Sequence, residues 1–249
     1  MNIGLYQSAA SLSALERWQE TVTQNITSGE ETAYKKHTTA FSGEEKGEFL
    51  TDAKSQVGKG EGLMATFPVA HTSISFQPGQ TRPTNQELDV ALQGEGFFEL
   101  KMPDGEKAYT RVGEFHLRSD RMVASSQDGL VMLESGQPLQ LRPGQGSLVI
   151  DESGNITQGG TALGKLAIRS FEKPENLVSL SAGLFIPGEG MEAAPVTKPE
   201  VLQGNLESSN STSLQEMVDL VTISRAYEAN QKLISSRDEL LDKTLQAFG

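Results

Sequence analysis

The chain has no cysteine among its 249 residues, which excludes disulfides, cysteine-ligated zinc and thiol catalysis. Tryptophan occurs once, and no apolar run approaches the roughly 18 residues that a membrane-spanning helix needs. Basic residues are outnumbered, and the net charge of −12 argues against nucleic acid as a partner, because phosphate contacts need a basic face. Residues 1–10 have neither a basic start nor an apolar core, so we expect no secretory signal peptide.

The last forty residues carry the clearest pattern that is present. No proline or glycine occurs between Asn210 and Phe248, and Ser213 followed by Glu216 matches a capping box, so a helix is predicted to begin there. Two apolar series then repeat every seven residues, the first being Leu220, Tyr227, Ile234, Leu241 and Phe248, and the second Ala226, Leu233, Leu240 and Ala247. Ile223 and Asn230 fall between the turns of the first series. A repeat held at seven favours packing against other helices with a slight supercoil.

A second amphipathic helix is predicted over residues 3–27, ending before Gly29. Its apolar face consists of Leu5, Leu12, Leu15, Val22 and Ile26. This helix is the natural partner for the C-terminal one, either within one chain or between chains.

The residues between the two helices divide into two further parts. Residues 31–80 are polar and irregular and are predicted to be an extended segment that packs on neighbours, because a structureless loop this long is unusual in a compact domain. Residues 81–207 contain short alternating runs between turn signals, which predict an all-β domain of hairpins. We therefore expect an α+β, mainly β fold, in which residues 1–30 and 208–249 form a coiled-coil-like terminal domain.

The residue types that carry chemistry form no convincing site. His37 and His71 lie in the irregular segment, and His116 lies on the polar side of a predicted strand. Gly58–Gly62 resembles a phosphate loop but follows no strand, and Asp151–Asn155 is better explained as a hairpin turn than as a calcium loop. Glycosidase chemistry needs two carboxylates across a cleft, for which Glu95, Glu99 and Asp104 are weak candidates. We therefore expect no catalytic residue, no metal and no cofactor.

Several blocks together resemble the bacterial flagellar rod and hook proteins. Leu88–Phe98 and Ala108–Phe115 look like the central signature of that family, and Glu216–Leu220 and Arg225–Asn230 look like its C-terminal signature. The segment 203–210 is similar to the stretch that precedes the latter signature. The blocks occur in the order found in the family, and the resemblance covers essentially the whole chain.

One block departs from the pattern of that family. After the first helix the family usually carries Asn-Leu-Ala-Asn and then Gly-Phe-Lys, whereas here residues 24–29 and 33–36 stand in their place. Asn25 and Tyr34 are the closest counterparts. This departure affects how closely the first loop follows the contacts between subunits in the family.

The resemblance implies a structural axial subunit that polymerises through its terminal helices into a hollow rod around the export channel. The implied partners are the chain itself, other rod proteins and the flagellar type III export apparatus, and the implied location is the periplasm-spanning basal body. The compact length favours the proximal rod protein, with the distal rod protein as the alternative. Two other classes stay open, namely a discrete coiled-coil binding module and a glycan-directed enzyme.

The predicted assembly interface combines both helices. It comprises Leu5, Leu12, Leu15, Val22, Ile26, Leu220, Ile223, Tyr227, Asn230, Leu233, Ile234, Leu240, Leu241 and Phe248.

Overall fold

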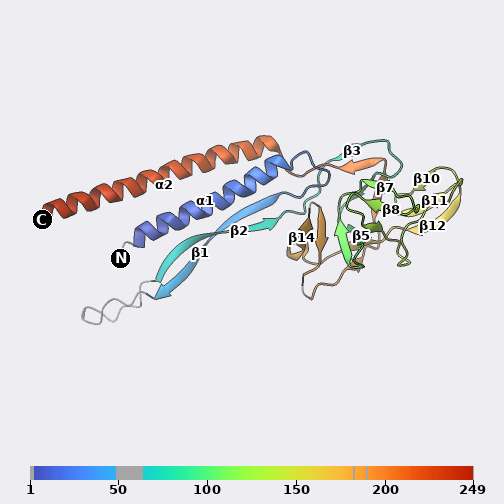
Figure 1. The fold of residues 1–249 in the computed structure, drawn as a ribbon, viewed down its shortest axis with the longest axis horizontal. Coiled ribbons are helices and arrows are strands. Elements are labelled where there is room, and N and C mark those ends of the chain that lie inside the picture. The colour runs from blue at the N-terminus through green and yellow to red at the C-terminus, as the bar shows by residue number, and fades with distance from the viewer. Residues whose placement is uncertain (1–2, 49–63, 182, 189, 249) are drawn as a thin grey trace. The chain divides into compact units, whose positions relative to one another are not determined.

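The computed structural model describes residues 3–48, 64–181, 183–188 and 190–248. It contains two helices, one near each end of the chain, and is otherwise mainly β (Figure 1). The chain divides into two compact units. The helical unit consists of residues 1–27, 37–73 and 213–249, and the β unit consists of residues 28–36 and 74–212.

Both helices begin and end where the sequence predicts. Helix α1 spans Ile3–Thr27 and helix α2 spans Ser213–Phe248. The apolar periodicity, the absence of proline and glycine in α2, and Gly29 just beyond α1 explain these bounds.

The helical unit also contains a two-stranded sheet that the sequence analysis missed. The irregular segment expected over residues 31–80 forms strands β1 (His37–Glu48) and β2 (Met64–Ile74) over much of its described part. Thr38 Oγ1 lies 3.0 Å from Ser73 Oγ, and His71 Nε2 lies 3.0 Å from Ser42 Oγ, so the strands run antiparallel. Strand β1 is mainly polar, and no turn signal marked the two strands as a hairpin.

The β unit is built around a nine-stranded sheet. Its strands are ordered β14-β15-β6-β5-β9-β8-β7, with β13 paired to β5 and to β16. Their bounds are β5 (Phe97–Lys101), β6 (Lys107–Thr110), β7 (Phe115–Leu117), β8 (Val123–Ser125), β9 (Leu130–Val131), β13 (Ile168–Ser170), β14 (Val178–Ser181), β15 (Leu184–Ile186) and β16 (Ala194–Pro195). A short 3₁₀ helix, Pro174–Asn176, precedes β14.

Three smaller sheets complete the β unit. They are β10 (Leu148–Ile150), β11 (Asn155–Gln158) and β12 (Thr161–Lys165); β4 (Val90–Gln93) with β17 (Glu200–Gln203); and β3 (Thr81–Pro83) with β18 (Asn205–Glu207). The predicted turn at Asp151 joins β10 to β11, and the Asp151 carboxylate accepts hydrogen bonds from the backbone amides of Ser153 and Asn155. The Asn155 side-chain amide also donates to Asp151 Oδ2 at 2.8 Å, and this bond, followed by the one from the Asn155 backbone amide, holds the pKa of Asp151 below its usual range.

The core of the β unit is continuous and apolar. Phe98, Leu100 and Ile156 are fully buried at its centre. A second cluster of aromatic rings surrounds Phe97, which makes edge-to-face contacts with Phe171 and Phe185. Leu117 of β7 is 45% exposed, because β7 is the last strand of its sheet.

Three stretches of the β unit lie near residues of the helical unit in the sequence. Hydrogen bonds join these three stretches to one another. Glu207 Oε1 accepts hydrogen bonds from Lys35 Nζ at 2.6 Å and from the amide of Gly79 at 2.7 Å. Asn210 Nδ2 donates to the carbonyls of Ser75 and Gln77. These side chains tie residues 28–36, 74–80 and 207–210 together, and we call this group the junction cluster.

Candidate assembly interface

Helices α1 and α2 pack side by side in antiparallel orientation (Figure 1). Near the end of α1, Asn25 Nδ2 donates a 3.1 Å hydrogen bond to Glu216 Oε2 at the start of α2. Near the beginning of α1, Gly4 lies directly against the guanidinium group of Arg237, so closely that a Cβ atom would overlap it. The same number of residues separates these contacts on both helices, so one register holds along the whole of α1.

Part of the predicted interface is satisfied inside one chain. Leu15, Val22 and Ile223 are buried together, and Ile223 is only 1% exposed. The partly buried side chains packed around them are Trp18, Ile26, Leu220 and Ala226. These residues of the predicted interface therefore contact α1 of their own chain, so only the other predicted residues are available to bind other subunits.

The other residues of the predicted interface are exposed to solvent to different extents. Leu233 and Leu240, from the second seven-residue series, are 56% and 63% exposed. Leu12, Tyr227, Asn230 and Ile234 are partly buried. The side chains of Leu5, Leu241 and Phe248 lie outside the part that the structure describes. The second series thus changes environment along the helix, because Ala226 is partly buried against α1 whereas Leu233 and Leu240 are exposed.

Asn25 is a structural residue of this region that the predicted interface does not include. Its amide nitrogen donates to the carbonyl of His37 at 2.8 Å, and its amide oxygen accepts from the amide of His37 at 2.9 Å. With the bond to Glu216, one side chain joins α1, β1 and α2. Burial lowers the pKa of His37 below its usual value, which favours the neutral ring. The resemblance pointed to Asn25 as a family counterpart, but no periodic signal marked its role.

Helix α2 carries another uncovered apolar face, which the seven-residue series did not include. Leu214, Met217, Val218 and Val221 are 75%, 53%, 53% and 52% exposed. Their spacing of three, four and seven residues is the signal that would have identified this face. We call these four residues the start patch.

The candidate catalytic carboxylates have structural roles or lie at the surface. Glu99 is 3% exposed and is bound by Lys107 at 2.8 Å and by Arg169 at 2.7 Å. Burial alone would raise the pKa of Glu99, but the hydrogen bonds and charges of these two cations outweigh it and lower the pKa. Asp104 Oδ1 accepts the amide of Glu106 in a turn, and Glu95 is exposed beside a cavity of about 550 Å³.

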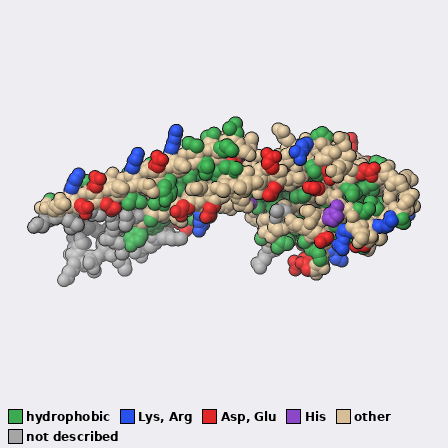
Figure 2. Space-filling model, turned by 45° about the horizontal axis from the view of Figure 1, so that its top comes forward, with side chains coloured by type: hydrophobic (Ala, Val, Ile, Leu, Met, Phe, Trp, Pro, Cys, Tyr) green, Lys and Arg blue, Asp and Glu red, His purple; other side chains and the backbone are tan. Residues whose placement is uncertain are grey.

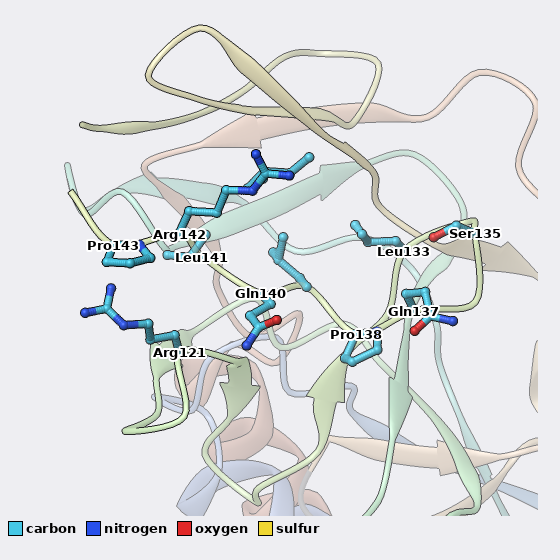
Figure 3. A pocket seen from close by; sticks show the side chains of 11 residues that line it. Arg121, Leu133, Ser135, Gln137, Pro138, Gln140, Leu141, Arg142 and Pro143 are labelled. Atoms are coloured by element: carbon cyan, nitrogen blue, oxygen red, sulfur yellow. The ribbon is translucent and has the colours of Figure 1, made fainter. Parts of the chain in front are cut away.

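A second cavity, of about 440 Å³, lies in the β unit beside the β7–β8 turn (Figure 3). Arg121 and Arg142 lie toward one side of it, and Ser135, Gln137 and Pro138 toward the other. The described residues that line it include no aspartate, glutamate or histidine, so it brings together none of the predicted catalytic groups.

Across residues 3–48, 64–181, 183–188 and 190–248, no group of three or more histidine or carboxylate side chains is placed to hold a metal ion. Neither helix, over its described residues, is long and apolar enough to cross a membrane. Gly58–Gly62 lies outside the described residues.

Two family models match the chain. Residues 91–158 match the flagellar hook protein FlgE/F/G D1 domain, which here covers strands from β4 to β11. Residues 202–247 match the flagellar basal body rod FlgEFG protein C-terminal model, which covers Asn210 of the junction cluster and nearly all of α2.

The relatives extend this match over the full length. The chain is similar to the flagellar basal-body rod protein FlgG of Borreliella burgdorferi, with 30% identity over 95% of each chain. It is also similar to the rod protein FlgF of Rhizobium meliloti, with 28% identity over 100% of this chain and 99% of the relative. FlgG of Buchnera aphidicola subsp. Acyrthosiphon pisum is 34% identical over 72% of each chain.

The agreement spans the β unit, the junction cluster and α2, and it includes relatives of both the FlgG and the FlgF kind. These relatives are rod proteins of the flagellar basal body. The chain belongs to the flagellar basal-body rod protein family and is a structural protein, not an enzyme.

Proposed function

We propose that this chain is an axial subunit of the rod that polymerises through its terminal helices into a hollow helical assembly. The observation that carries the proposal is the exposure of Leu233 and Leu240 on α2, at 56% and 63%. Leucine side chains repeated at seven residues on an uncovered helix face favour a contact with a further helix. Burying each one would contribute about 1.5–3 kcal/mol to assembly.

The helical tube would enclose the export channel and transmit torque, and the chain would reach the rod through the flagellar export apparatus. Among rod positions we keep the proximal one as the proposal, with the distal one as the alternative. Relatives of the FlgF and the FlgG kind match at similar identity. Rescue of motility in a strain lacking FlgF supports the proximal position, and rescue of motility in a strain lacking FlgG supports the distal one.

The test introduces a charge on the exposed face of α2. Leu233→Glu is expected to abolish rod assembly and motility, because a carboxylate in an apolar helix contact is desolvated without a partner. The matched control is Gln231→Glu, which places the same charge at an exposed polar position of the same helix. Motility of cells carrying each variant, and intact basal bodies seen by electron microscopy, provide the measurement.

A motile strain with Leu233→Glu would contradict the proposed interface. Mass measurement of purified assemblies addresses the binding-module alternative, because a module forms one complex of fixed size and a rod subunit joins many copies.

A further inference from the structure

Helix α2 extends past the helix that covers it. Arg237 of α2 lies opposite Gly4, and α1 as described begins only one residue earlier, at Ile3, whereas α2 continues to Phe248. At about 1.5 Å per residue, the last ten residues of α2 run roughly 15 Å beyond α1. Figure 1 shows the C-terminal end of α2 lying well beyond the N-terminal end of α1. We call residues 239–248 the overhang.

The overhang carries apolar side chains that no described residue covers. Leu240 is 63% exposed, and Ala247 is also exposed. A helix end of this length is marginal by itself in water and is stabilised mainly by packing an apolar face against another element. The overhang therefore presents one half of an apolar contact.

The start patch lies near the opposite end of α2. Glu216 and Ile223, which face α1, are 2% and 1% exposed, whereas the four residues of the start patch are each more than half exposed. At about 100° per residue, the centre of the start patch lies roughly half a turn around the helix from Ile223, so α1 cannot cover it. Figure 2 shows apolar side chains gathered over the first turns of α2, with charged side chains farther along the helix.

We propose that the overhang of one copy of this chain docks on the start patch of the next copy. This inference rests on the proposed rod function and names the two surfaces that meet along the rod. The start patch spans two turns, about 10 Å, and the overhang about 15 Å, so the two surfaces are similar in length. None of the four patch residues is charged. The overhang carries Glu239, Asp242 and Lys243 besides its apolar residues, so the side of it that matches the patch is the one with Leu240 and Ala247, seven residues apart.

The two surfaces differ, and this determines the form of the assembly. A contact between unlike surfaces of identical chains is heterologous, and it continues as an open line of copies unless the rotation closes a ring. A contact of one start patch with another would be isologous and would stop at a dimer. The chain belongs to a family of rod proteins, and a line of copies joined from head to tail matches that architecture.

The absence of cysteine makes the proposal directly testable by cross-linking. A chain carrying both Val218→Cys and Leu240→Cys is expressed in place of the wild type in flagellated cells, which are then treated with a mild oxidant. The two positions are 22 residues apart on one helix, about 33 Å, so a disulfide cannot form within a chain. The expected result is a ladder of dimers, trimers and larger products.

Matched variants measure how much cross-linking occurs without the proposed contact. Chains with Val218→Cys alone should give about tenfold fewer cross-links than the double variant, because disulfides require Cα atoms within about 7 Å. The control pair Val218→Cys with Gln231→Cys moves the second thiol to an exposed site outside the overhang and should give no ladder. A second test pair, Met217→Cys with Ala247→Cys, guards against local disturbance by either substitution.

The outcomes separate this inference from the proposed function. Motile cells without a ladder in either test pair, or efficient dimers of Val218→Cys alone, would overturn the head-to-tail contact and leave the rod assignment intact. Loss of motility in both test pairs also counts against it, because cysteine keeps both surfaces apolar. Failure of the wild-type chain to support basal-body assembly would overturn the proposed function and this contact together.

Discussion

The two units bury their apolar residues to very different extents. In the β unit, Phe98 and Leu100 are completely buried within a large continuous cluster. In the helical unit, the buried cluster between the helices is Leu15, Val22 and Ile223, while α2 alone exposes Leu214, Met217, Val218, Val221, Leu233 and Leu240. The β unit therefore buries a large apolar core of its own, whereas the described part of the helical unit leaves many apolar side chains of α2 exposed.

The units also differ in what contacts their buried charges: in the helical unit the buried carboxylate of Glu216 accepts a hydrogen bond from the Asn25 amide, whereas the β unit pairs opposite charges. The β unit buries Lys35 with Glu207 at 2.6 Å and Glu99 with Arg169 at 2.7 Å. Burial lowers the pKa of Lys35 despite the opposing effect of Glu207. Removing Lys35 would leave the buried Glu207 carboxylate without its closest cation, so this pair constrains the arrangement of the β unit.

The largest expected effect is a contrast in amide hydrogen exchange. In the unassembled chain, amides of α2 should exchange on the order of 10⁴-fold faster than amides of β5, because local opening of the helical unit exposes little buried apolar surface. Mass spectrometry of peptides from residues 213–248 and 97–101 provides the comparison.

Assembly supplies the control for this contrast. In isolated basal bodies the exchange of α2 should slow while that of β5 stays unchanged. Equal protection of α2 and β5 in the monomer would show that the helical unit is complete without partners.

A smaller effect is expected from opening a cavity in the β unit. Phe98→Ala should lower the free energy of unfolding of that unit by about 3–5 kcal/mol, because a fully buried ring is lost. Urea denaturation followed by far-ultraviolet circular dichroism measures the change. Leu117→Ala is the matched control, since Leu117 is 45% exposed and its truncation should cost much less. Similar losses for the two variants would contradict the view that one compact core stabilises the β unit.

The smallest expected effect is the loss of part of the stability of the β unit at acidic pH. The pKa of Glu99 is lowered in the folded protein, so its ionised form stabilises the β unit above the pKa of the unfolded chain, near 4.3. That contribution is lost as pH falls through the lower folded pKa. Glu99→Gln should cost about 1–3 kcal/mol at pH 7, and the difference from wild type should shrink below pH 4.

Urea titrations at pH 7 and pH 3.5 provide the measurement. Glu106→Gln, at an exposed position in the neighbouring turn, should change little at either pH. A wild-type advantage over Glu99→Gln that is constant with pH would show that Glu99 acts through packing and not through its charge.

The sequence predicted the two helices and many of the strands because their signals are local. The seven-residue series and the run without glycine or proline define α2, and alternation next to a turn defines strands such as β11. The hairpin of β1 and β2 was missed because β1 is mainly polar and the connection carries no short turn signature.

Local sequence signals were also insufficient to divide the candidate interface into covered and exposed residues. Ile223 and Leu233 are both apolar residues of one helix, and their spacing does not reveal which side α1 covers. That distinction depends on the packing register set by Asn25 with Glu216 and by Gly4 with Arg237. Glu207 and Lys35 were likewise invisible as a pair, because 172 residues separate them in sequence.

The junction cluster has a mechanical consequence. Residues 28–36, 74–80 and 207–210, which adjoin the helical unit in sequence, are cross-connected through Glu207 and Asn210. Tension applied along any one of these stretches is therefore shared with the other two through short hydrogen bonds, including one between buried charges. Several bonds must then break together before one stretch can be pulled out. The places where the chain passes from one unit to the other are thus held together by several hydrogen bonds, so a pulling force must break these bonds together before it can separate one stretch from the rest.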